Sequence, residues 1–448
     1  MNICYEFDTI YAQATPFGIG AVAVIRISGD KSWDIAREIF SKKNISEGKI
    51  EYGWIIENNN KIDEVIVLPF KAPKSFTGED VIEIQCHGGI NIVKKILDLI
   101  STKGARMAEK AEFTKRAFMN GRIDLTKAEA IDDIIHAKTT RFACKSALNL
   151  SGVLAIGIED IKNDLFKLLA TINAAIDFPE DVPEPEYETL EKEILKIKLK
   201  IEKILSGAKS SNILRDGAKI AIIGKPNAGK SSLFNKLLNL ERAIVTDIAG
   251  TTRDILTETI AVNGIPLTFI DTAGIRKEKD INPVEAIGIE YSIRSIDEAD
   301  VILFLFDSNT DFGDDDEKVF SLIKDKKYIK VGTKIDLQKD TQKTQPDTIY
   351  ISVLQDETIE TLKNAIVEKI LNGDFNETDY ITNQRQQSCA QRALTALNEA
   401  LNGVYEHQLQ DLISIDIKSA LLCVNEISGE VITDDILNDI FENFCIGK

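Results

Sequence analysis

Residues 224–233 read Gly-Lys-Pro-Asn-Ala-Gly-Lys-Ser-Ser-Leu, between an apolar run at 219–223 and a helix-like run at 233–238. This is the P-loop pattern G-x-x-x-x-G-K-[ST] in a strand–loop–helix context. Its glycines let successive backbone N–H groups turn toward phosphate oxygens, and the following helix adds the positive end of its dipole. The stretch therefore predicts a nucleoside triphosphate site, with Lys230 at the β- and γ-phosphates and the Ser231 hydroxyl on Mg²⁺.

Two later segments predict the γ-phosphate side of this site. Residues 245–254 look like a switch loop, in which the hydroxyl of Thr252 would join the Mg²⁺ shell. An apolar strand at 267–270 ends in the pattern D-x-x-G, formed by Asp271 and Gly274. Asp271 would reach the metal through water, and Gly274 would approach the γ-phosphate closely.

A third segment predicts the base. Residues 332–336 read Gly-Thr-Lys-Ile-Asp and resemble the guanine motif N-K-x-D, with Thr333 where asparagine is commoner. The carboxylate of Asp336 can accept hydrogen bonds from guanine N1–H and from the 2-amino group, and adenine has neither donor. Residues 352–354, which begin with Ser352, are a degenerate version of the last base-contacting loop.

The residue after the D-x-x-G pattern is Ile275, where Ras-type GTPases carry a glutamine that orients the attacking water. Isoleucine can orient nothing, so other groups must position water and neutralise charge. Asn227 can hold a monovalent cation near the phosphates, or it can be a simple turn residue after Pro226. Glu285 can orient water, or it can be a solvated carboxylate on a helix face. The residues alone leave both pairs of readings open.

The bulk composition bounds the class of protein. The chain has 448 residues, a net charge of −18, 44% hydrophobic residues and six cysteines. Its length predicts two to four domains, and no run approaches the roughly 18–20 apolar residues of a membrane span. The first eight residues lack the parts of a signal peptide, and the cysteines show no C-x-x-C pairing. We therefore expect a cytoplasmic protein that does not associate with membranes.

A nucleic-acid contact on so acidic a chain must rest on a local basic patch. One candidate run carries seven cations against three carboxylates: Lys103, Arg106, Lys110, Lys115, Arg116, Arg122 and Lys127. A phosphate-binding surface and a solvated helix face are both compatible with this run.

The pattern along the chain predicts a multidomain α+β and α/β protein. Short strand-like runs near 21–27, 64–68 and 81–85 alternate with helices in an N-terminal α+β domain, residues 1–120. Apolar seams at helical spacing occur in 121–214 (Leu190, Ile194, Ile197, Ile201, Ile204) and in 377–448 (Leu394, Leu397, Leu401, Val404). We expect these two parts to form one helical domain, with the nucleotide domain, residues 215–376, inserted through short exposed connections such as 214–217.

These motifs and the two ends of the chain resemble the MnmE (TrmE) family of tRNA modification GTPases over essentially the full length. The segments that carry the resemblance, besides the P-loop, are residues 12–16, 26–29, 75–80, 87–89, 112–118, 174–179 and the C-terminal Phe-Cys-Ile-Gly-Lys at 444–448. The resemblance implies an N-terminal folate-binding domain that dimerises, a split helical domain and an inserted Ras-like P-loop G domain.

The resemblance also implies an activity. Such a protein is a K⁺-dependent GTPase and a homodimer that works in a heterotetramer with the FAD/NADH-dependent protein MnmG. Together they install an aminomethyl-type (carboxymethylaminomethyl) group on C5 of the wobble uridine of certain tRNAs. The carbon comes from 5-formyl- or methylene-tetrahydrofolate, and potassium-dependent pairing of G domains across the dimer accelerates hydrolysis.

The resemblance assigns the site residues by position. The nucleotide site would comprise Asn227, Ala228, Gly229, Lys230, Ser231, Ser232, Thr246, Asp247, Ile248, Ala249, Gly250, Thr251, Thr252, Asp271, Thr272, Ala273, Gly274, Thr333, Lys334, Ile335, Asp336 and Ser352. Within it, K⁺ would be surrounded by Asn227, Thr246, Ile248 and Thr251, and Mg²⁺ would be bound by Ser231 and Thr252.

The resemblance assigns the remaining roles in the same way. Glu285 would orient water, Arg253 would stabilise the active arrangement, and Cys445 would be a functional thiol near the folate. Physical reasoning alone also allows Cys445 to be a small apolar residue that docks the tail. Folate contacts would be Arg26, Glu83, Arg122 and Lys448. The other cysteines are expected to be structural or incidental, and His87, before two glycines, is expected to lie in a tight turn.

Two rival functions remain to be separated from this one. A binding-type GTPase of the ribosome-assembly kind would recruit partners rather than perform chemistry, so loss of the Cys445 thiol would leave its output intact. A folate-binding protein with a vestigial G domain would bind GTP too weakly to matter, given Thr333 and Val353 in the base-recognition loops.

Overall fold

The computed structural model describes residues 8–240, 258–270, 296–310, 312–337, 345–371, 381–442, 444 and 446–448. The chain divides into two compact units. The first unit comprises 1–132, 149–170 and 414–448, and the second comprises 133–148 and 171–413. Each is considered by itself. The predicted domain boundaries differ from these units and stay predictions.

The first unit contains a six-stranded sheet in the order β3-β4-β5-β2-β1-β6. Its strands are β1 (Ile10–Gln13), β2 (Val22–Ser28), β3 (Glu51–Glu57), β4 (Asn60–Phe70), β5 (Val81–His87) and β6 (Arg106–Met107). All neighbours are antiparallel except β1 and β6. Residues alternate between buried and half-buried along β4, so one face of the sheet carries the core.

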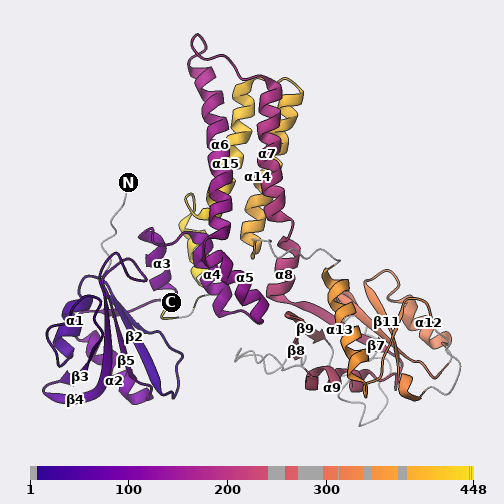
Figure 1. Ribbon diagram of the computed structural model, residues 1–448, viewed down its shortest axis with the longest axis horizontal. Coiled ribbons are helices and arrows are strands. Elements are labelled where there is room, and N and C mark those ends of the chain that lie inside the picture. The colour runs from indigo at the N-terminus through magenta and orange to yellow at the C-terminus, as the bar shows by residue number, and fades with distance from the viewer. Residues whose placement is uncertain are drawn as a thin grey trace. The chain divides into compact units, whose positions relative to one another are not determined.

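Two helices cover the core face of this sheet. The core cluster joins apolar residues of the strands to α1 (Ser32–Ile39) and α2 (Ile90–Ser101). Arg26 of β2 lies opposite Glu83 of β5 in register, and both alternate with the buried residues Ile25, Ile27 and Ile84. Arg26 and Glu83 therefore belong to the face of the sheet opposite to these buried residues; α1 and α2 lie beside the sheet in Figure 1.

The C-terminal residues of the chain pack within the first unit. Its other helices are α3 (Glu112–Met119), α4 (Leu125–Ile135), α16 (Asp434–Phe441) and the parts within this unit of α6 (Val153–Asp177) and α15 (Gln410–Ser428). Leu125 of α4 shares an apolar cluster with Leu437, Phe441 and Phe444. Lys115 donates to Asn438 at 3.2 Å. Segments from the two ends of the chain thus form one core.

The second unit contains a six-stranded sheet in the order β12-β11-β10-β7-β9-β8, parallel except for β8 and β9. Its strands are β7 (Ala218–Gly224), β8 (Glu258–Val262), β9 (Ile265–Ile270), β10 (Val301–Asp307), β11 (Tyr328–Thr333) and β12 (Thr348–Tyr350). The first six residues of β10 are all buried, as expected for a parallel strand covered on both faces. Helices α9 (Lys230–Leu240) and α13 (Asp356–Leu371) pack in one core cluster, and α12 (Asp314–Ser321) in the other.

Helices before and after this sheet in the sequence pack together. α7 (Tyr187–Leu205) lies along α14 (Gln384–Tyr405), and the Tyr405 hydroxyl donates to Glu191 at 3.0 Å. All five predicted seam residues of α7 are buried, which confirms that prediction. In α14 the prediction is only partly right. Leu397, Leu401 and Val404 are buried, but Leu394 is half-buried and small residues such as Ala393 complete the seam.

The prediction that residues 214–217 form an exposed connection is wrong. It is the end of α8 (Ala208–Asp216), and Leu214 is fully buried in the core of the second unit. Gly217 has φ +89°, and a Cβ there would lie 2.4 Å from the carbonyl oxygen of Pro266. α5 (Thr140–Leu150) contributes Phe142 to the same core.

Within the described ranges, no single helix has the length and apolarity needed to cross a membrane. The bent pair α5 and α6 meets the requirement jointly, by length and composition only.

Candidate functional site

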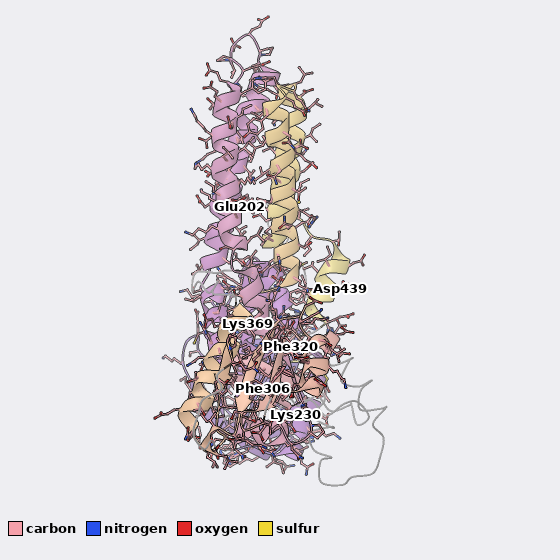
Figure 2. All side chains as sticks on the ribbon, turned by 90° about the vertical axis from the view of Figure 1, so that its right-hand side faces the viewer. Glu202, Lys230, Phe306, Phe320, Lys369 and Asp439 are labelled. Atoms are coloured by element: carbon pink, nitrogen blue, oxygen red, sulfur yellow. The ribbon has the colours of Figure 1, made fainter. Side chains whose placement is uncertain are left out.

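The P-loop of the second unit connects β7 to α9 in a tightly curled backbone. Gly224 has φ +159°, Asn227 has φ +63° and Gly229 has φ +92°. A Cβ at Gly224 would lie 2.2 Å from the carbonyl oxygen of Leu305, so only glycine lets β7 and β10 approach this closely. The predicted strand–loop–helix context of the P-loop is present, and α9 begins at Lys230. Lys230 is labelled in Figure 2.

Lys230 lies across the loop that precedes it. Its Nζ donates to the carbonyl oxygens of Gly224 at 3.0 Å and Lys225 at 2.8 Å. Ser231 and Ser232 follow in the first turn of α9, where backbone N–H groups have no partner within the helix. The loop therefore fits a polyphosphate, since an ammonium, helix N–H groups and a hydroxyl gather at its mouth.

The predicted base-recognition segments lie beside the P-loop. The Thr333 hydroxyl at the end of β11 donates to the carbonyl oxygen of Ala228 at 2.8 Å and contacts that of Phe306 at 3.2 Å. Asp336 lies in the 3-10 turn η2 (Ile335–Leu337), and the Ser352 hydroxyl donates to its Oδ1 at 2.6 Å. Three segments far apart in the sequence thus meet at one end of the parallel sheet.

Lys334, between these two residues, adopts φ +62° and its Nζ pairs with Asp307 at 2.8 Å. Burial alone would raise the pKa of Asp307, but hydrogen bonds from Lys334 and Asn309 outweigh burial and hold that pKa below its ordinary value. Asp307 is therefore ionised at neutral pH and holds the Lys334 ammonium by an ion pair.

Several predicted residues of this site lie outside the described residues. These are Thr246, Asp247, Ile248, Ala249, Gly250, Thr251, Thr252, Arg253, Asp271, Thr272, Ala273, Gly274 and Glu285. Cys445 also lies outside them.

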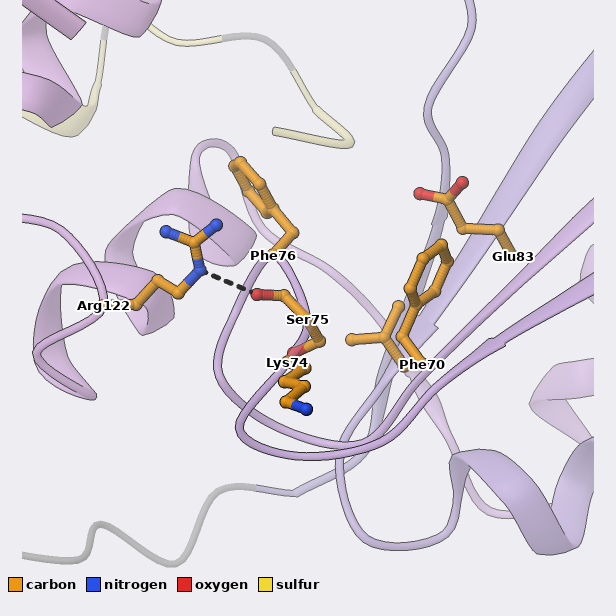
Figure 3. Close-up of a pocket in the computed structure, with 7 residues that line it drawn as sticks. Phe70, Lys74, Ser75, Phe76, Glu83 and Arg122 are labelled. Atoms are coloured by element: carbon orange, nitrogen blue, oxygen red, sulfur yellow. Dashed lines mark hydrogen bonds between the residues drawn. The ribbon is translucent and has the colours of Figure 1, made fainter. Parts of the chain in front are cut away.

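The first unit contains a cavity of about 460 Å³ at the end of the β4–β5 hairpin (Figure 3). It is lined by Phe70, Lys74, Ser75, Phe76, Val81, Glu83 and Arg122. Arg122 is held there, because its Nε donates to the carbonyl oxygen of Ser75 at 2.9 Å. Glu83 and Arg122 are two of the four residues predicted to contact folate.

The other two predicted residues lie next to the cavity. The Arg26 guanidinium pairs with Glu83 at 2.8 Å and stands over the ring of Phe76, 4.9 Å from its centroid, and over that of Phe113 at 5.4 Å. The carbonyl oxygen of Lys448 accepts a hydrogen bond from the Phe113 N–H at 3.2 Å. Aromatic walls with nearby cations suit a planar heteroaromatic ring that carries carboxylates.

Phe70, Lys74, Phe76 and Phe113 were not among the predicted site residues. Phe76 and Phe113 fall inside segments that carry the family resemblance, but nothing in their spacing marks Phe76 as cavity-lining or Phe113 as the ring under Arg26. Phe70 ends a strand whose alternation predicts only a sheet face. The places of Lys74 and Phe76 follow from the loop between β4 and β5, whose path no local pattern specifies.

Two arginines of the basic run 103–127 form ion pairs within the first unit. Arg116 is buried, with 2% of its side chain exposed, and pairs with Asp8, Glu79 and Glu112. Arg106 also pairs with Asp8 and Glu112, each at 2.6 Å. Both readings of the run are wrong for these two arginines, because their charges are neutralised inside the first unit.

His87 does not lie in a turn, as was predicted, but ends β5. Its Nδ1 lies 2.6 Å from Asp63 Oδ1. In the described ranges no group of three or more histidine, cysteine, aspartate or glutamate residues could hold a metal ion. Burial raises the pKa of the Cys86 thiol to about 11, in agreement with the expectation of a structural cysteine.

The chain matches known proteins over almost its whole length. Residues 9–122 match the family model of the GTP-binding protein TrmE N-terminus, and residues 125–445 match that of the MnmE helical domain. The tRNA modification GTPase MnmE of Acetivibrio thermocellus is 43% identical over 99% of this chain and 100% of its own length. That of Thermotoga petrophila is 41% identical over 98% of this chain and 100% of its own length.

Among solved structures, the chain is similar to the G domain of the FeoB iron transporter of T. maritima, at 24% identity. That likeness covers 34% of this chain and 98% of the other, with a TM-score of 0.26. The two family models and the full-length relatives decide the assignment: this chain belongs to the MnmE family of tRNA modification GTPases.

Proposed function

We propose that this chain hydrolyses GTP and that hydrolysis serves the modification of tRNA. The observation that carries the proposal is the hydrogen bond from Thr333 to Ala228, which ties the P-loop to the base-recognition segment at the end of the sheet. Lys230 binds the β- and γ-phosphates, and its ammonium leaves the loop carbonyls for the phosphate oxygens when nucleotide enters. The full-length relatives named tRNA modification GTPase support the tRNA context.

Selectivity for guanine rests on Asp336. Its Oδ1 accepts from the buried Ser352 hydroxyl, so the carboxylate is oriented by a bond that does not involve the nucleotide. The remaining acceptor capacity is available to guanine N1–H and the 2-amino group. Measurement of GTP and ATP affinities by titration calorimetry tests this point. Equal affinities would remove the GTPase proposal and favour a folate-binding protein with a vestigial G domain.

Potassium replaces the missing glutamine in the proposed mechanism. Asn227 is exposed and has a left-handed backbone, with φ +63°. In the proposal its oxygen joins Thr246, Ile248 and Thr251 around K⁺, Ser231 and Thr252 bind Mg²⁺, Glu285 orients water and Arg253 stabilises the arrangement. GTP turnover in KCl should far exceed turnover in NaCl at equal ionic strength. Equal rates would contradict the cation site.

The cavity of the first unit is the proposed folate site. Its aromatic lining would take the ring system of 5-formyl- or methylene-tetrahydrofolate, with Arg26, Arg122 and Lys448 toward its anionic groups and Glu83 toward ring N–H donors. Glu83→Gln should weaken binding of 5-formyltetrahydrofolate, measured by calorimetry. Asp34→Asn, at an exposed carboxylate of α1, is the matched control and should bind as the wild type does.

We further propose that the chain acts as a cytoplasmic homodimer with the FAD/NADH-dependent protein MnmG. Together they install the carboxymethylaminomethyl group on C5 of the wobble uridine, with Cys445 as a functional thiol. Cys445→Ser should keep GTP turnover and lose the tRNA modification, measured by mass spectrometry of tRNA nucleosides. If modification persists, Cys445 has no chemical role, and a GTPase that only recruits partners becomes the better description.

A further inference from the structure

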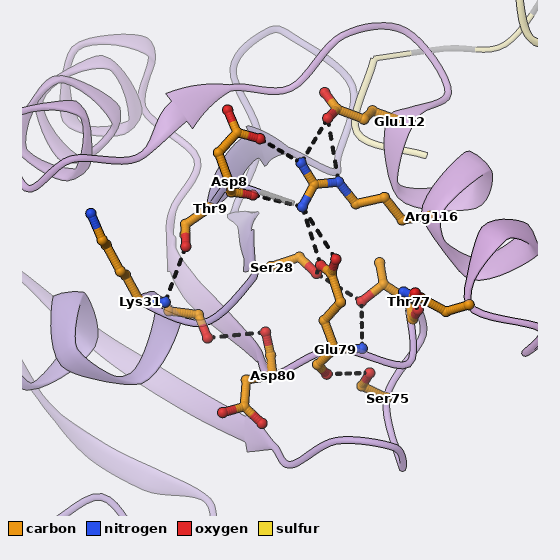
Figure 4. Close-up of polar contacts among 12 residues, drawn as sticks. Asp8, Thr9, Ser28, Lys31, Ser75, Thr77, Glu79, Asp80, Glu112 and Arg116 are labelled. Atoms are coloured by element: carbon orange, nitrogen blue, oxygen red, sulfur yellow. Dashed lines mark hydrogen bonds and ion pairs between the residues drawn. The ribbon is translucent and has the colours of Figure 1, made fainter. Parts of the chain in front are cut away.

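The loop between β4 and β5 has two sides with different contacts. On one side Lys74, Ser75 and Phe76 line the cavity of the first unit. On the other side Thr77 and Glu79 contact buried polar groups (Figure 4). Because residues 71–80 belong to no helix or strand, the position of the cavity wall depends on these side-chain bonds.

Arg116 is the centre of the contacts behind the loop. Its Nη1 contacts both carboxylate oxygens of Glu79 at 3.3 Å, and its Nη2 donates to Glu112 at 2.8 Å. The Ser28 hydroxyl donates to Glu79 at 2.6 Å and lies 2.7 Å from the Thr77 hydroxyl. The Arg116 side chain is only 2% exposed, and its ion pairs with Glu79 and Glu112 fix the position of the guanidinium.

The bonds continue from Glu79 to the cavity. The carbonyl oxygen of Glu79 accepts from the Ser75 hydroxyl at 2.6 Å, and the carbonyl oxygen of Ser75 accepts from Arg122 Nε at 2.9 Å. The helix that carries Arg116 also holds the loop from its other end, because Asn120 donates to the Thr77 carbonyl at 2.9 Å.

We propose that Arg116 and Glu79 are positioning residues for the ligand of this cavity. Neither residue lines the cavity, but their bonds hold Ser75, Phe76 and Arg122 in place around it. The buried ion pair behind the loop thus sets the affinity of the site in front of it. The inference rests on the proposed function only for the choice of 5-formyltetrahydrofolate as the probe.

Arg106 offers a matched control within the same network. It pairs with Asp8 and Glu112, as Arg116 does, but no contact joins it to Glu79 in the described part of the chain. Its side chain is 44% exposed, so its loss is tolerated more easily. A role of Glu79 confined to the stability of the first unit predicts that Glu79→Gln lowers the free energy of unfolding but leaves the affinity of the folded protein unchanged. A positioning role predicts that only Glu79 affects the cavity.

The experiment compares Glu79→Gln and Arg106→Gln in the full chain. The probe affinity is measured by calorimetry, and backbone hydrogen exchange of residues 74–80 is measured without ligand. Tryptophan fluorescence reports whether the first unit is folded, because both tryptophans, Trp33 and Trp54, belong to it. Glu79→Gln should weaken the probe about tenfold and accelerate exchange in the loop, since it removes a charge-assisted hydrogen bond. Arg106→Gln should leave both within about twofold, as expected at a site that the loop does not contact.

Wild-type affinity and exchange in Glu79→Gln, or equal effects of the two variants, would overturn the inference. Arg116→Lys gives a second test, because a lysine keeps the charge but cannot bridge Glu79 and Glu112 in the same way; it should resemble Glu79→Gln. If the wild type does not bind the probe, the folate proposal fails. Loop exchange then decides alone: acceleration in Glu79→Gln but not in Arg106→Gln supports the positioning role, and equal exchange refutes it.

Discussion

Replacement of Thr333 by valine should loosen the nucleotide site without changing its shape. The Thr333 side chain is 3% exposed, and its hydroxyl donates to the carbonyl oxygen of Ala228 in the P-loop at 2.8 Å. Valine has nearly the same volume but no hydroxyl. Ala228 is also 3% exposed, so water cannot readily replace the lost donor. The P-loop would keep its fold but lose its bond to the segment that carries Asp336.

The size of the effect follows from the bond that is lost. A typical hydrogen bond contributes about 0.5–1.5 kcal/mol, and a buried acceptor left without a donor costs about 1–3 kcal/mol. If the loop relaxes so that part of this cost is recovered, about 1–2 kcal/mol remains, which is roughly a 5- to 30-fold change in an equilibrium constant. GTP affinity should fall within this range, because binding must restore the P-loop to its bound position.

The assay is GTP affinity by calorimetry for three variants. Thr333→Asn should bind GTP nearly as the wild type does, since its amide N–H can donate to Ala228 in place of the hydroxyl. Thr361→Val makes the same chemical change at an exposed position of α13, where the hydroxyl donates to the carbonyl oxygen of Glu357 at 3.0 Å. This variant should bind GTP with the affinity of the wild type. Wild-type affinity in Thr333→Val would refute the claim that this hydroxyl couples the two segments.

Three further predictions concern single groups. Asp336→Asn should reduce the preference for GTP over ATP, measured as the ratio of their affinities, because the amide presents one acceptor and a donor. Burial alone would raise the pKa of Glu112, but hydrogen bonds from groups such as Arg106 lower it to about 2. The Glu112 carboxylate therefore stabilises the first unit fully above its ordinary pKa of 4.5, and this contribution is lost as pH falls through 2. Urea unfolding followed by tryptophan fluorescence should show a weaker pH dependence of the free energy of unfolding between pH 4.5 and 2 in Glu112→Gln than in the wild type. Iodoacetamide at pH 8 should label exposed Cys144 and spare buried Cys86, whose pKa is about 11, as peptide mass spectrometry would show.

Much of the fold could be predicted because its signals are local. The P-loop with its preceding strand, the apolar strand at 267–270 and the seam of α7 each occupy one continuous stretch with a recognisable pattern. Strands β1, β3, β6, β8 and β12 were missed. β1 has four residues and β6 has two, and such short segments show no period. Leu214 was misread because a helix end packed into a core has the same composition as an exposed connection.

The contacts that hold the predicted site residues in place could not be predicted, for one physical reason. Thr333, Arg122 and Lys230 each donate to a backbone carbonyl, those of Ala228, Ser75 and Gly224. Every residue carries a carbonyl, so the identity of the acceptor residue leaves no mark in the sequence. The motif shows which side chain performs the chemistry, but the tertiary fold decides which carbonyl lies beside that side chain and fixes its position.

Donor side chains and acceptor carbonyls should differ in how they respond to mutation at the two candidate sites. A change at an acceptor position such as Ala228 keeps the carbonyl and should be tolerated if the new side chain fits. A change at the donor removes the bond itself. Donor positions should therefore be far more sensitive than acceptor positions in a scan of GTP or folate affinity. Equal sensitivity at both would mean that side-chain packing, rather than these hydrogen bonds, holds the loops.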